Sequence, residues 1–400
     1  MSIGPAGGAM TESAKRWAES GLAHLTGEPD GPPDFSRSRI LEHADQAAAP
    51  FGVDAALLLA GRAGLTGTSR GGRTSVGGST RLIRCRDNWC VFTLARPSDL
   101  DVIGALLETG EPIDDPWRML ADAAAEHEAA ELVERGRLLG MPCAVLDSHA
   151  GKPIVAQRLW STRAARPIDS GLLVVDLSAM WAGPLCGQLL RGLGATVIKV
   201  ESPDRPDGAR YGNADFFEWM NGGKLQFSAP VSSESPVLAA LLDVADVVIE
   251  ASRPRALEQA GLAAVTRAPR SGRVWVRITG YGAGHNVRDR VAFGDDAAVA
   301  GGLVGAGTHG PIFCGDAVAD PLTGLEAAHA VLESLGRGGG EVLDVAMAGV
   351  AARYAAIPLA TAGSDTAVSA PPVPAIVRHP VEKVDAHRVR QLIDERTGLC

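Results

Sequence analysis

Residues 171–210 read GLLVVDLSAMWAGPLCGQLLRGLGATVIKVESPDRPDGAR, and this stretch decides the fold that the sequence predicts. Residues 172–177 form a short, nearly continuous apolar run, which is typical of a parallel strand covered on both faces. Leucines at helical spacing follow as far as Gly194, and residues 196–200 are a β-branched run that ends at Glu201. The sequence therefore predicts a βαβ unit, whose helix N-terminus favours a phosphate or a developing anion.

A unit of this kind has two interpretations. In a dinucleotide-binding unit, Glu201 would hold a ribose hydroxyl. The turn before the helix, SAMWAGP at residues 178–184, lacks the three-glycine fingerprint of that class. A bulky Trp181 and a Pro184 also stand where the pyrophosphate would approach. The turn therefore favours a different ligand.

Short apolar runs downstream extend the pattern. Residues 247–250 and 274–278 predict two further buried strands, with a helix near residues 256–264 between them. Strands that alternate with helices form a parallel sheet with right-handed crossovers. The predicted fold class is therefore α/β, a doubly wound parallel Rossmann-like sheet, accompanied by a smaller α+β domain.

The first 165 residues carry a different pattern. A glycine-rich loop, SRGGRTSVGGS at residues 69–79, precedes two strand-like runs at 80–86 and 89–95. Asp87-Asn88 predicts a two-residue hairpin turn between these runs. The other predicted elements are helical segments at 12–25, 37–49, 53–65, 99–140, 321–335 and 384–396, and strands at 142–146 and 341–345.

These elements predict four parts of the chain. They are an N-terminal helical segment with the glycine-rich loop (1–75), a small α+β domain (76–165), a Rossmann-like catalytic domain (166–365), and a proline-rich linker with a C-terminal helix (366–400). The 400 residues are enough for two domains with large cores.

Composition excludes several classes of partner. The apolar fraction of 46% and the charged fraction of 21% are those of a globular protein. A net charge of −9 without a dense basic run argues against nucleic acid. The longest apolar runs are too short to span a bilayer. We expect a cytoplasmic protein that binds neither nucleic acid nor a membrane.

The cysteines predict neither a metal site nor a disulfide framework. Their spacing gives no Cys-x-x-Cys pair and no cluster with histidine, so reduced and mostly buried thiols are expected. Cys186 stands near a predicted helix start, where the pKa of a thiol can be lowered, but no base lies near it in sequence. The six cysteines are Cys85, Cys90, Cys143, Cys186, Cys314 and Cys400.

The βαβ segment resembles a known family closely. AGP at residues 182–184, LGATVIKVE at 193–201 and the proline-rich turn as far as Arg210 resemble the N-terminal signature of the class III, CaiB/BaiF-type CoA-transferases. That family also contains carnitine-CoA transferases and α-methylacyl-CoA racemases. The resemblance implies a Rossmann-like CoA-binding domain, an acyl-CoA thioester and a carboxylic acid as substrates, no permanently bound cofactor, and a homodimer whose chains can interlock.

The order of the family's parts differs in this chain. Residues 77–160 resemble the family's small domain, which ordinarily follows the catalytic part. LTGEPDGPP at residues 25–33 resembles the segment that in relatives lies just before the catalytic aspartate. The resemblance therefore implies a shifted module order, through circular permutation or a tandem array cut out of phase.

One aspartate matches the family's nucleophile. DPLTGLEAAHAVLESL at residues 320–335 resembles the motif in which an Asp opens an alanine-rich helix, with Asp320 as the nucleophile. From the residues alone, Asp320 followed by Pro321 reads as a helix N-cap. The two roles are compatible, because a helix N-terminus stabilises a carboxylate anion. Asp316 is the nearby alternative and lies outside the motif.

The resemblance implies roles for other residues. The turn Met180-Trp181-Ala182-Gly183 would lie against the thioester, and the Gly77-Gly78 loop would shield the activated intermediates. Many relatives carry Gln at the position of Trp181. The residues that would border CoA are Met180, Gly183, Glu201, Asn221, Lys224 and Arg253.

Three of these have a second interpretation. Lys224 could face a phosphate or could be a solvated surface lysine. Glu201 could be a structural group at a strand end or lie near a ribose. Arg253 survives in a loop where the family's neighbouring Asn, Phe and Gly are replaced, so its contacts with CoA are less certain to be kept.

Two alternative functions remain open. A racemase of the same superfamily needs a second base, ordinarily a His, and Asp295 stands at its place in residues 293–296, FGDD. An Asp/Asp proton transfer is conceivable, because burial can raise the pKa of a carboxyl group into a useful range. His309 and His329 lie nearby in sequence but outside the motif. A non-catalytic acyl-CoA-binding homologue is the third hypothesis.

Overall fold

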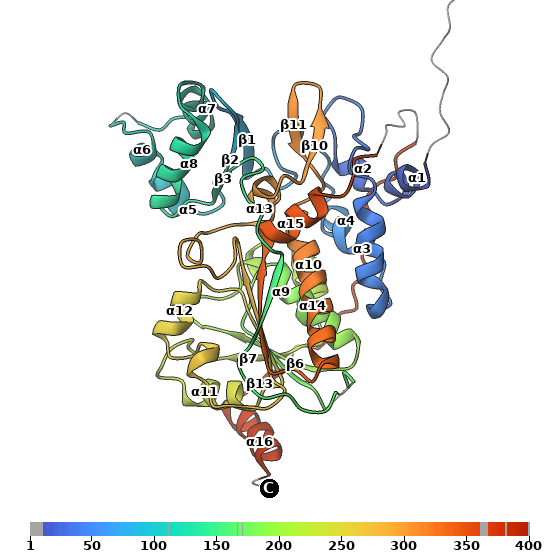
Figure 1. Cartoon of the computed structure of the whole chain (residues 1–400), viewed down its shortest axis with the longest axis vertical. Coiled ribbons are helices and arrows are strands. Elements are labelled where there is room, and N and C mark those ends of the chain that lie inside the picture. Colours follow the sequence, from blue (N-terminus) through green and yellow to red (C-terminus); the bar gives the residue numbers. More distant parts are fainter. Residues whose placement is uncertain are drawn as a thin grey trace, which may run out of the picture.

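The fold is built around an eight-stranded sheet, seen near the centre of Figure 1. The computed structural model describes residues 11–110, 112–165, 167–169, 171–360, 367–380 and 382–398. The strands of this sheet are β4 (Ile154–Arg158), β5 (Leu173–Asp176), β6 (Thr196–Glu201), β7 (Leu225–Ser228), β8 (Val247–Glu250), β9 (Val274–Thr279), β12 (Glu341–Ala346) and β13 (Lys383–Val384).

The strand order is β13-β7-β6-β5-β8-β9-β12-β4. Every neighbouring pair is parallel except β12 and β4. The chain runs outward from β5 through β6 to β7, then returns to β8 on the other side of β5 and continues to β12. The predicted doubly wound parallel sheet is therefore confirmed, and its topological switch point lies between β5 and β8.

The sheet separates two apolar cores. Strand side chains alternate between them, so Val174 faces one core while Leu173 and Val175 face the other. The first face is covered by α9 (Ala182–Gly192), α10 (Ala214–Asn221), α13 (Gly294–Ala300), α14 (Ala319–Gly336) and α15 (Met347–Ala355). The opposite face is covered by α11 (Pro236–Val244), α12 (Pro254–Gln259) and α16 (Ala386–Thr397).

The N-terminal helices extend the first core. They are α1 (Glu12–Glu19), α2 (Leu22–Leu25), α3 (Ile40–Ala48) and α4 (Ala55–Thr66), and their buried side chains join those of α14. The predicted single helix over residues 12–25 is wrong, because Gly21 adopts a left-handed φ of 80° and separates α1 from α2. A side chain at Gly21 would also collide with Pro371 of the proline-rich segment.

The small α+β unit has its own core. It contains β1 (Thr80–Arg84), β2 (Trp89–Thr93) and β3 (Cys143–Val145), with helices α5 (Pro97–Asp101), α6 (Ile103–Leu106), α7 (Pro116–Glu126) and α8 (Ala129–Leu138). The predicted hairpin turn is wrong by one residue, because the Cys85 N–H donates to Asn88 O at 2.8 Å and leaves Arg86-Asp87 at the tip. Asp87 Oδ1 instead accepts from the Ala129 N–H at the start of α8, at 2.8 Å.

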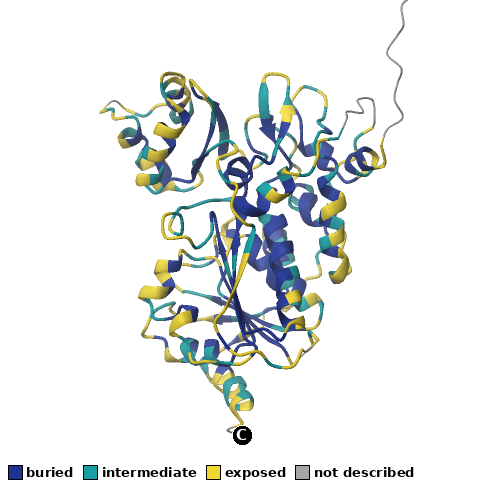
Figure 2. Cartoon of the chain, viewed as in Figure 1, coloured by how far each residue is buried: buried dark blue, intermediate teal, exposed yellow. Residues whose placement is uncertain are grey.

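Figure 2 shows that buried residues concentrate in the sheet and in α14, whereas β4 is mainly exposed. β4 is antiparallel to β12 at the sheet edge, and four of its five residues are exposed. That burial leaves no alternating apolar pattern, so the sequence did not predict this strand. The hairpin of β10 (Val304–Gly307) and β11 (Gly310–Phe313) was also not predicted.

The described part of the chain holds no group of three or more His, Cys, Asp or Glu side chains arranged to bind a metal ion. Cys85, Cys90, Cys143, Cys186 and Cys314 are free and buried, while Cys400 lies outside the described residues. Over the same residues, no single helix is long and apolar enough to cross a membrane; α3 with the following turn and α4 pass such a test only as a pair bent by 100°.

Candidate active site

Asp320 lies in the first turn of α14, which begins at Ala319. The predicted N-cap role is wrong, because Val318 holds the cap position and Pro321 is the third helical residue. Asp320 Oδ2 instead accepts a hydrogen bond from the N–H of Gly294, the first residue of α13, at 3.1 Å. Asp320 is a half-buried residue, whereas its neighbours Ala319 and Pro321 are buried.

Two other carboxylates, Asp295 and Asp316, and one cation, Arg62, lie near Asp320. Burial raises the pKa of Asp320 to about 7, opposed by the Arg62 guanidinium and the Gly294 N–H; the neighbouring Asp295 and Asp316 carboxylates raise it. Burial also raises the pKa of Asp295 to about 6, and Asp316 adds to this increase while Arg62 opposes it. Two of these carboxyl groups, Asp295 and Asp320, therefore have pKa values raised toward neutral pH.

Arg62 is the functional-site candidate that the sequence analysis missed. Its Nε donates to Asp316 Oδ2 at 2.8 Å, and its Nη2 pairs with Asp316 Oδ1, so the guanidinium holds the carboxylate through two bonds. The guanidinium carbon also lies 4.9 Å from the centre of the Trp181 ring. A sequence signal existed, since Arg62 is the one charged residue of the helix AALLLAGRAGLT, α4.

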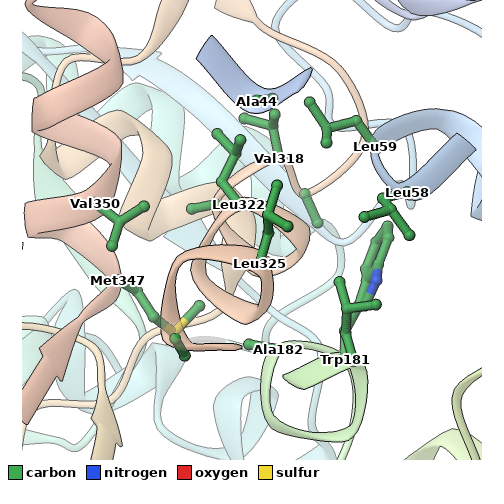
Figure 3. Close-up of a cluster of buried hydrophobic side chains, with 14 of the residues drawn as sticks. Ala44, Leu58, Leu59, Trp181, Ala182, Val318, Leu322, Leu325, Met347 and Val350 are labelled. Carbon is green, nitrogen blue, oxygen red and sulfur yellow. The ribbon is translucent and has the colours of Figure 1, made fainter. Parts of the chain in front are cut away.

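The turn before α9 brings Trp181 into the same cluster. Trp181 is buried and extends from the start of α9 toward Leu58 of α4, as Figure 3 shows. Ala182 lies directly against α14, because a Cβ placed on Gly324 would come within 2.5 Å of Ala182 O. Gly324 is one helical turn beyond Asp320, so the turn and the carboxylate share one corner of the α9–α14 interface.

Met180 adopts a strained backbone conformation in this turn. Its φ is 72°, a value that side chains other than glycine rarely adopt. The Met180 N–H donates to Asp207 Oδ1 at 2.9 Å, and the Met180 side chain is exposed. Gly183 has no room for a side chain, because a Cβ there would collide with Ser178. Contacts with neighbouring residues thus fix the conformation of this turn, which the local backbone preferences of its residues would not favour.

Two buried lysines, Lys199 and Lys224, bind backbone carbonyls of the turn at residues 178–184. Lys199 Nζ donates to Ser178 O at 2.8 Å and pairs with Asp207 Oδ2 at 2.8 Å. Lys224 Nζ pairs with Asp176 Oδ2 at 2.9 Å and donates to Pro184 O at 2.8 Å. These residues lie at the carboxyl ends of β5 and β6 and in the loop before β7, and their charges are paired inside the protein.

This pairing corrects the sequence interpretation of Lys224. Its ammonium group makes a third bond, to Asn221 Oδ1 at 3.2 Å, and is completely buried. Burial lowers the pKa of Lys224 to about 8, while Asp176 opposes the shift. Lys224 therefore neither faces a phosphate nor lies on the surface. Asn221 is buried beside it and serves the same network.

Glu201 borders the Lys199–Asp207 pair, whereas Arg253 lies elsewhere, before α12. Glu201 Oε1 accepts from the Asp207 N–H at 2.8 Å and from Arg210 Nε at 2.9 Å, which is a structural arrangement at the end of β6. Arg253 is exposed just before α12, at the carboxyl end of β8 and hence beside the switch point of the sheet.

The glycine-rich loop reaches the carboxylate cluster. A Cβ on Gly77 would lie 3.7 Å from Arg62 Nη2, and Gly78 adopts a left-handed φ of 79°. The buried Ser75 side chain hydrogen-bonds Asp295. The structure thus brings the Gly77-Gly78 loop, the Trp181 turn and Asp320 together around Arg62, within one chain.

Cys186 does not belong to the chemical site. It is fully buried in α9, and burial raises the pKa of its thiol. The lowered pKa that a helix start can produce is therefore not found here. A carboxylate such as Asp320, which has a pKa near neutral pH and lies close to the fixed Arg62 cation, can act as a nucleophile or as a base.

Comparison with known proteins matches these elements to one family. The family model described as CoA-transferase family III matches residues 170–389, which is more than half of the chain. The succinyl-CoA–D-citramalate CoA-transferase of Chloroflexus aurantiacus is 31% identical over 202 residues, covering 46% of this chain and 50% of that protein. The probable fatty acyl-CoA transferase Rv3272 of Mycobacterium tuberculosis is 35% identical over 133 residues, covering 30% and 34%. The chain thus spans half the length or less of these relatives.

Solved structures give partial matches. A crystal structure of Rv3272 from M. tuberculosis is 31% identical, with 47% of this chain and 55% of that chain covered and a TM-score of 0.40. A CAIB/BAIF family protein from Brucella suis is 30% identical, with 47% and 55% covered and a TM-score of 0.42. The matched residues 170–389 include the βαβ unit and Asp320, whereas Arg62 and Gly77 lie outside them. On the match of these residues, the chain belongs to CoA-transferase family III.

Proposed function

We propose that this protein transfers CoA from an acyl-CoA thioester to a carboxylic acid, with Asp320 as the nucleophile. The observation that carries the proposal is the Asp320 carboxylate of a half-buried residue, held by the Gly294 N–H in a cluster with Arg62. Its pKa of about 7 means that a large fraction is ionised at neutral pH. Family membership and relatives named as CoA-transferases support the same reaction.

The chemistry follows from a carboxylate that meets a thioester. An Asp320 oxygen attacks the acyl-CoA carbonyl, the C–S bond breaks, and a mixed anhydride and CoA thiolate result. The thiolate attacks the Asp320 carbonyl of the anhydride, which releases the first carboxylate and leaves an aspartyl-CoA thioester. The acceptor carboxylate attacks that thioester, its C–S bond breaks, and a second mixed anhydride and CoA thiolate result. The thiolate attacks the acceptor carbonyl of this anhydride, and the Asp320 carboxylate is the leaving group. Acyl-CoA leaves and Asp320 is regenerated without net proton transfer.

The surroundings of Asp320 supply the other requirements of this sequence. Each tetrahedral intermediate carries an oxyanion that needs fixed N–H donors. In the proposed arrangement, the backbone N–H groups at the start of α9, from Ala182 and Gly183, serve this purpose. The Gly77-Gly78 loop lies beside Arg62 and would shield the anhydride from water. CoA would extend over the carboxyl ends of β5 and β8, toward Met180 and the exposed Arg253.

Trapping of the covalent intermediate tests the proposal. The full chain would be incubated with a panel of acyl-CoAs and carboxylates, then treated with hydroxylamine and digested for mass spectrometry. We expect a hydroxamate on Asp320 and turnover that falls at least about 1000-fold in Asp320→Ala, with CoA binding retained. Asp101→Asn, at an exposed position of α5, is the matched control. Failure of every donor to give turnover or an adduct would favour the non-catalytic binding homologue.

A racemase is the second candidate, and one observation favours it. Asp295 and Asp320 belong to one cluster, with pKa values of about 6 and about 7, so two carboxyl groups near neutrality are available for proton transfer. Exchange of the substrate α-proton in D₂O, measured with a 2-methylacyl-CoA, separates the candidates. Exchange that is lost in Asp295→Asn, without formation of an aspartyl adduct, would support the racemase and contradict the transferase.

We also propose that the protein is a homodimer, on the family resemblance, and that it is cytoplasmic, on its composition. Sedimentation of the purified chain tests the dimer, and fractionation of cells that express it tests the location. The shifted module order stays a prediction, as do the four domain boundaries.

A further inference from the structure

We propose that Arg62 is a positioning residue of the CoA-transfer reaction, whose guanidinium fixes the turn that carries Asp320 and supplies the positive charge of the carboxylate cluster. This inference rests on the proposed nucleophilic role of Asp320. Arg62 lies in α4, outside the residues matched by the family model, so the family does not assign it this role.

The first argument is the anchoring of the turn. Arg62 binds both oxygens of Asp316, whose side chain is almost completely buried. The next residue, Ala317, has a φ of 43°, which is unfavourable for alanine. The Ala317 carbonyl accepts from the Asp320 N–H at 2.8 Å. The Arg62–Asp316 pair therefore holds a strained turn, and the backbone of Asp320 is hydrogen-bonded directly to that turn.

The second argument is the geometry of the guanidinium. It is a planar group that forms two parallel bonds to a carboxylate and can stack on an aromatic ring at the same time. Arg62 does both, toward Asp316 and toward Trp181, with 4.9 Å between the guanidinium carbon and the Trp181 ring centre. Lysine can supply the charge but not this double contact. Arg62 thus fixes the separation between the Trp181 turn and the Asp316 turn.

The third argument is the charge balance. The ionisable groups that act on Asp320 are Asp295 on α13, Asp316 in the preceding turn and Arg62 on α4. Arg62 opposes the increase in the pKa of Asp320 that burial and the carboxylates cause. Without the guanidinium, the pKa of Asp320 would rise above about 7, and less of the attacking carboxylate would exist at neutral pH.

Arg37 provides a matched control. It also comes from the N-terminal segment and joins it to the rest of the protein, donating to Val304 O at 2.8 Å, Gly302 O at 2.9 Å and Ala355 O at 2.7 Å. These three hydrogen bonds of Arg37 all go to backbone carbonyls and not to Asp295, Asp316 or Asp320. Loss of Arg37 therefore weakens the same packing without changing the charge of the cluster.

The test compares Arg62→Gln, Arg62→Lys and Arg37→Gln in the full chain. With the donor and acceptor that give turnover in the wild type, we expect kcat of Arg62→Gln to fall about 100-fold with little change in KM. The pH midpoint of kcat/KM should move up by about one pH unit. Arg62→Lys should restore the midpoint but only part of kcat. Arg37→Gln should lower thermal stability and leave the midpoint unchanged.

A second readout needs no turnover. Modification of Asp320 by a water-soluble carbodiimide and glycinamide, followed by mass spectrometry against pH, reports the protonated carboxyl group. In Arg62→Gln the modification should persist to higher pH than in the wild type. If wild-type and Arg62→Gln profiles coincide, or if Arg37→Gln shifts its profile equally, the role of Arg62 is wrong. A different outcome contradicts the proposed function instead. In it, the carbodiimide profile of Arg62→Gln is shifted from that of the wild type as expected, but the wild type gives no aspartyl-CoA adduct.

Discussion

The N–H of Gly294 donates to Asp320 Oδ2 at 3.1 Å, which joins the first residue of α13 to the first turn of α14. The contact needs glycine, because a Cβ on residue 294 would come within 2.5 Å of Asp320 Oδ2 and would also collide with Ala317 O. The N-terminal ends of α13 and α14 thus meet at the Asp320 carboxylate. The side chain of Asp320 is oriented by α13 and not by a capping role in α14.

Gly294→Ala should therefore displace Asp320. We expect turnover to fall at least about 100-fold, because small misplacements of a reacting group are costly, and we expect a loss of stability of about 1–3 kcal/mol from overpacking. Enzyme assays and urea unfolding measure the two effects. Gly192→Ala is the control, since no atom outside its chain neighbours and its own helix backbone lies within 4 Å of the added Cβ. Equal activities of the two variants would show that residue 294 does not position the carboxylate.

The pH dependence of the reaction should report the carboxylate cluster. If Asp320 attacks in its ionised form, as proposed, kcat/KM should rise with pH, reach half of its plateau near pH 7 and level off about one pH unit higher. Asp295→Asn removes a negative charge that raises this pKa, so the midpoint should move to lower pH. An unchanged midpoint in Asp295→Asn would mean that a different group controls the acid limb.

Lys224→Met tests whether this lysine is structural. The change leaves Asp176 buried without its ion-pair partner, so we expect a loss of about 3–5 kcal/mol in the free energy of unfolding. Since the ammonium group does not face solvent, the KM for acyl-CoA should change little while the protein stays folded. Lys383→Met, at an exposed position of β13, is the control for loss of a positive charge. A large rise in KM with unchanged stability would instead support the interpretation that Lys224 contacts a phosphate of CoA.

Asp296 should contribute a pH-dependent term to stability. It is buried on α13, accepts from Thr93 Oγ1 of the small unit at 3.2 Å, and has a pKa raised by burial to about 8. A folded-state pKa above the unfolded value stabilises the fold at low pH, and this contribution is lost as the pH rises toward 8. The drop in unfolding free energy between pH 5 and pH 8 should be smaller in Asp296→Asn by about 1–3 kcal/mol. Parallel pH curves for the two proteins would contradict this.

The parallel sheet could be predicted because its strands carry a strong local signal. All four residues of β5 and of β8 are buried, and their continuous apolar runs identify them. β4 could not be found in this way, since it is stabilised by its register with β12 rather than by apolar side chains. The break at Gly21 depends on contact with Pro371, which is 350 positions away in the sequence and leaves no local trace.

In the candidate site, too, some residues could be predicted from local sequence and others depend on contacts that only the fold creates. Asp320 and the Trp181 turn belong to motifs, so their residue types and spacing are visible in the sequence. Arg62 acts through contacts with Asp316 and Trp181, and only the fold brings these three residues together. Lys224 was misinterpreted because a lysine after two glycines resembles a surface loop, whereas its burial depends on Asp176 in β5.

The pair between Arg62 and Asp316 joins residues 254 positions apart in the chain. Closing so large a loop is slow, because much chain entropy is lost before the contact forms. During synthesis α4 is complete long before α14 leaves the ribosome, so its guanidinium has no partner for most of translation. The carboxylate cluster around Asp320 consequently acquires its cation only when α14 has docked, so a partly made chain lacks the assembled cluster.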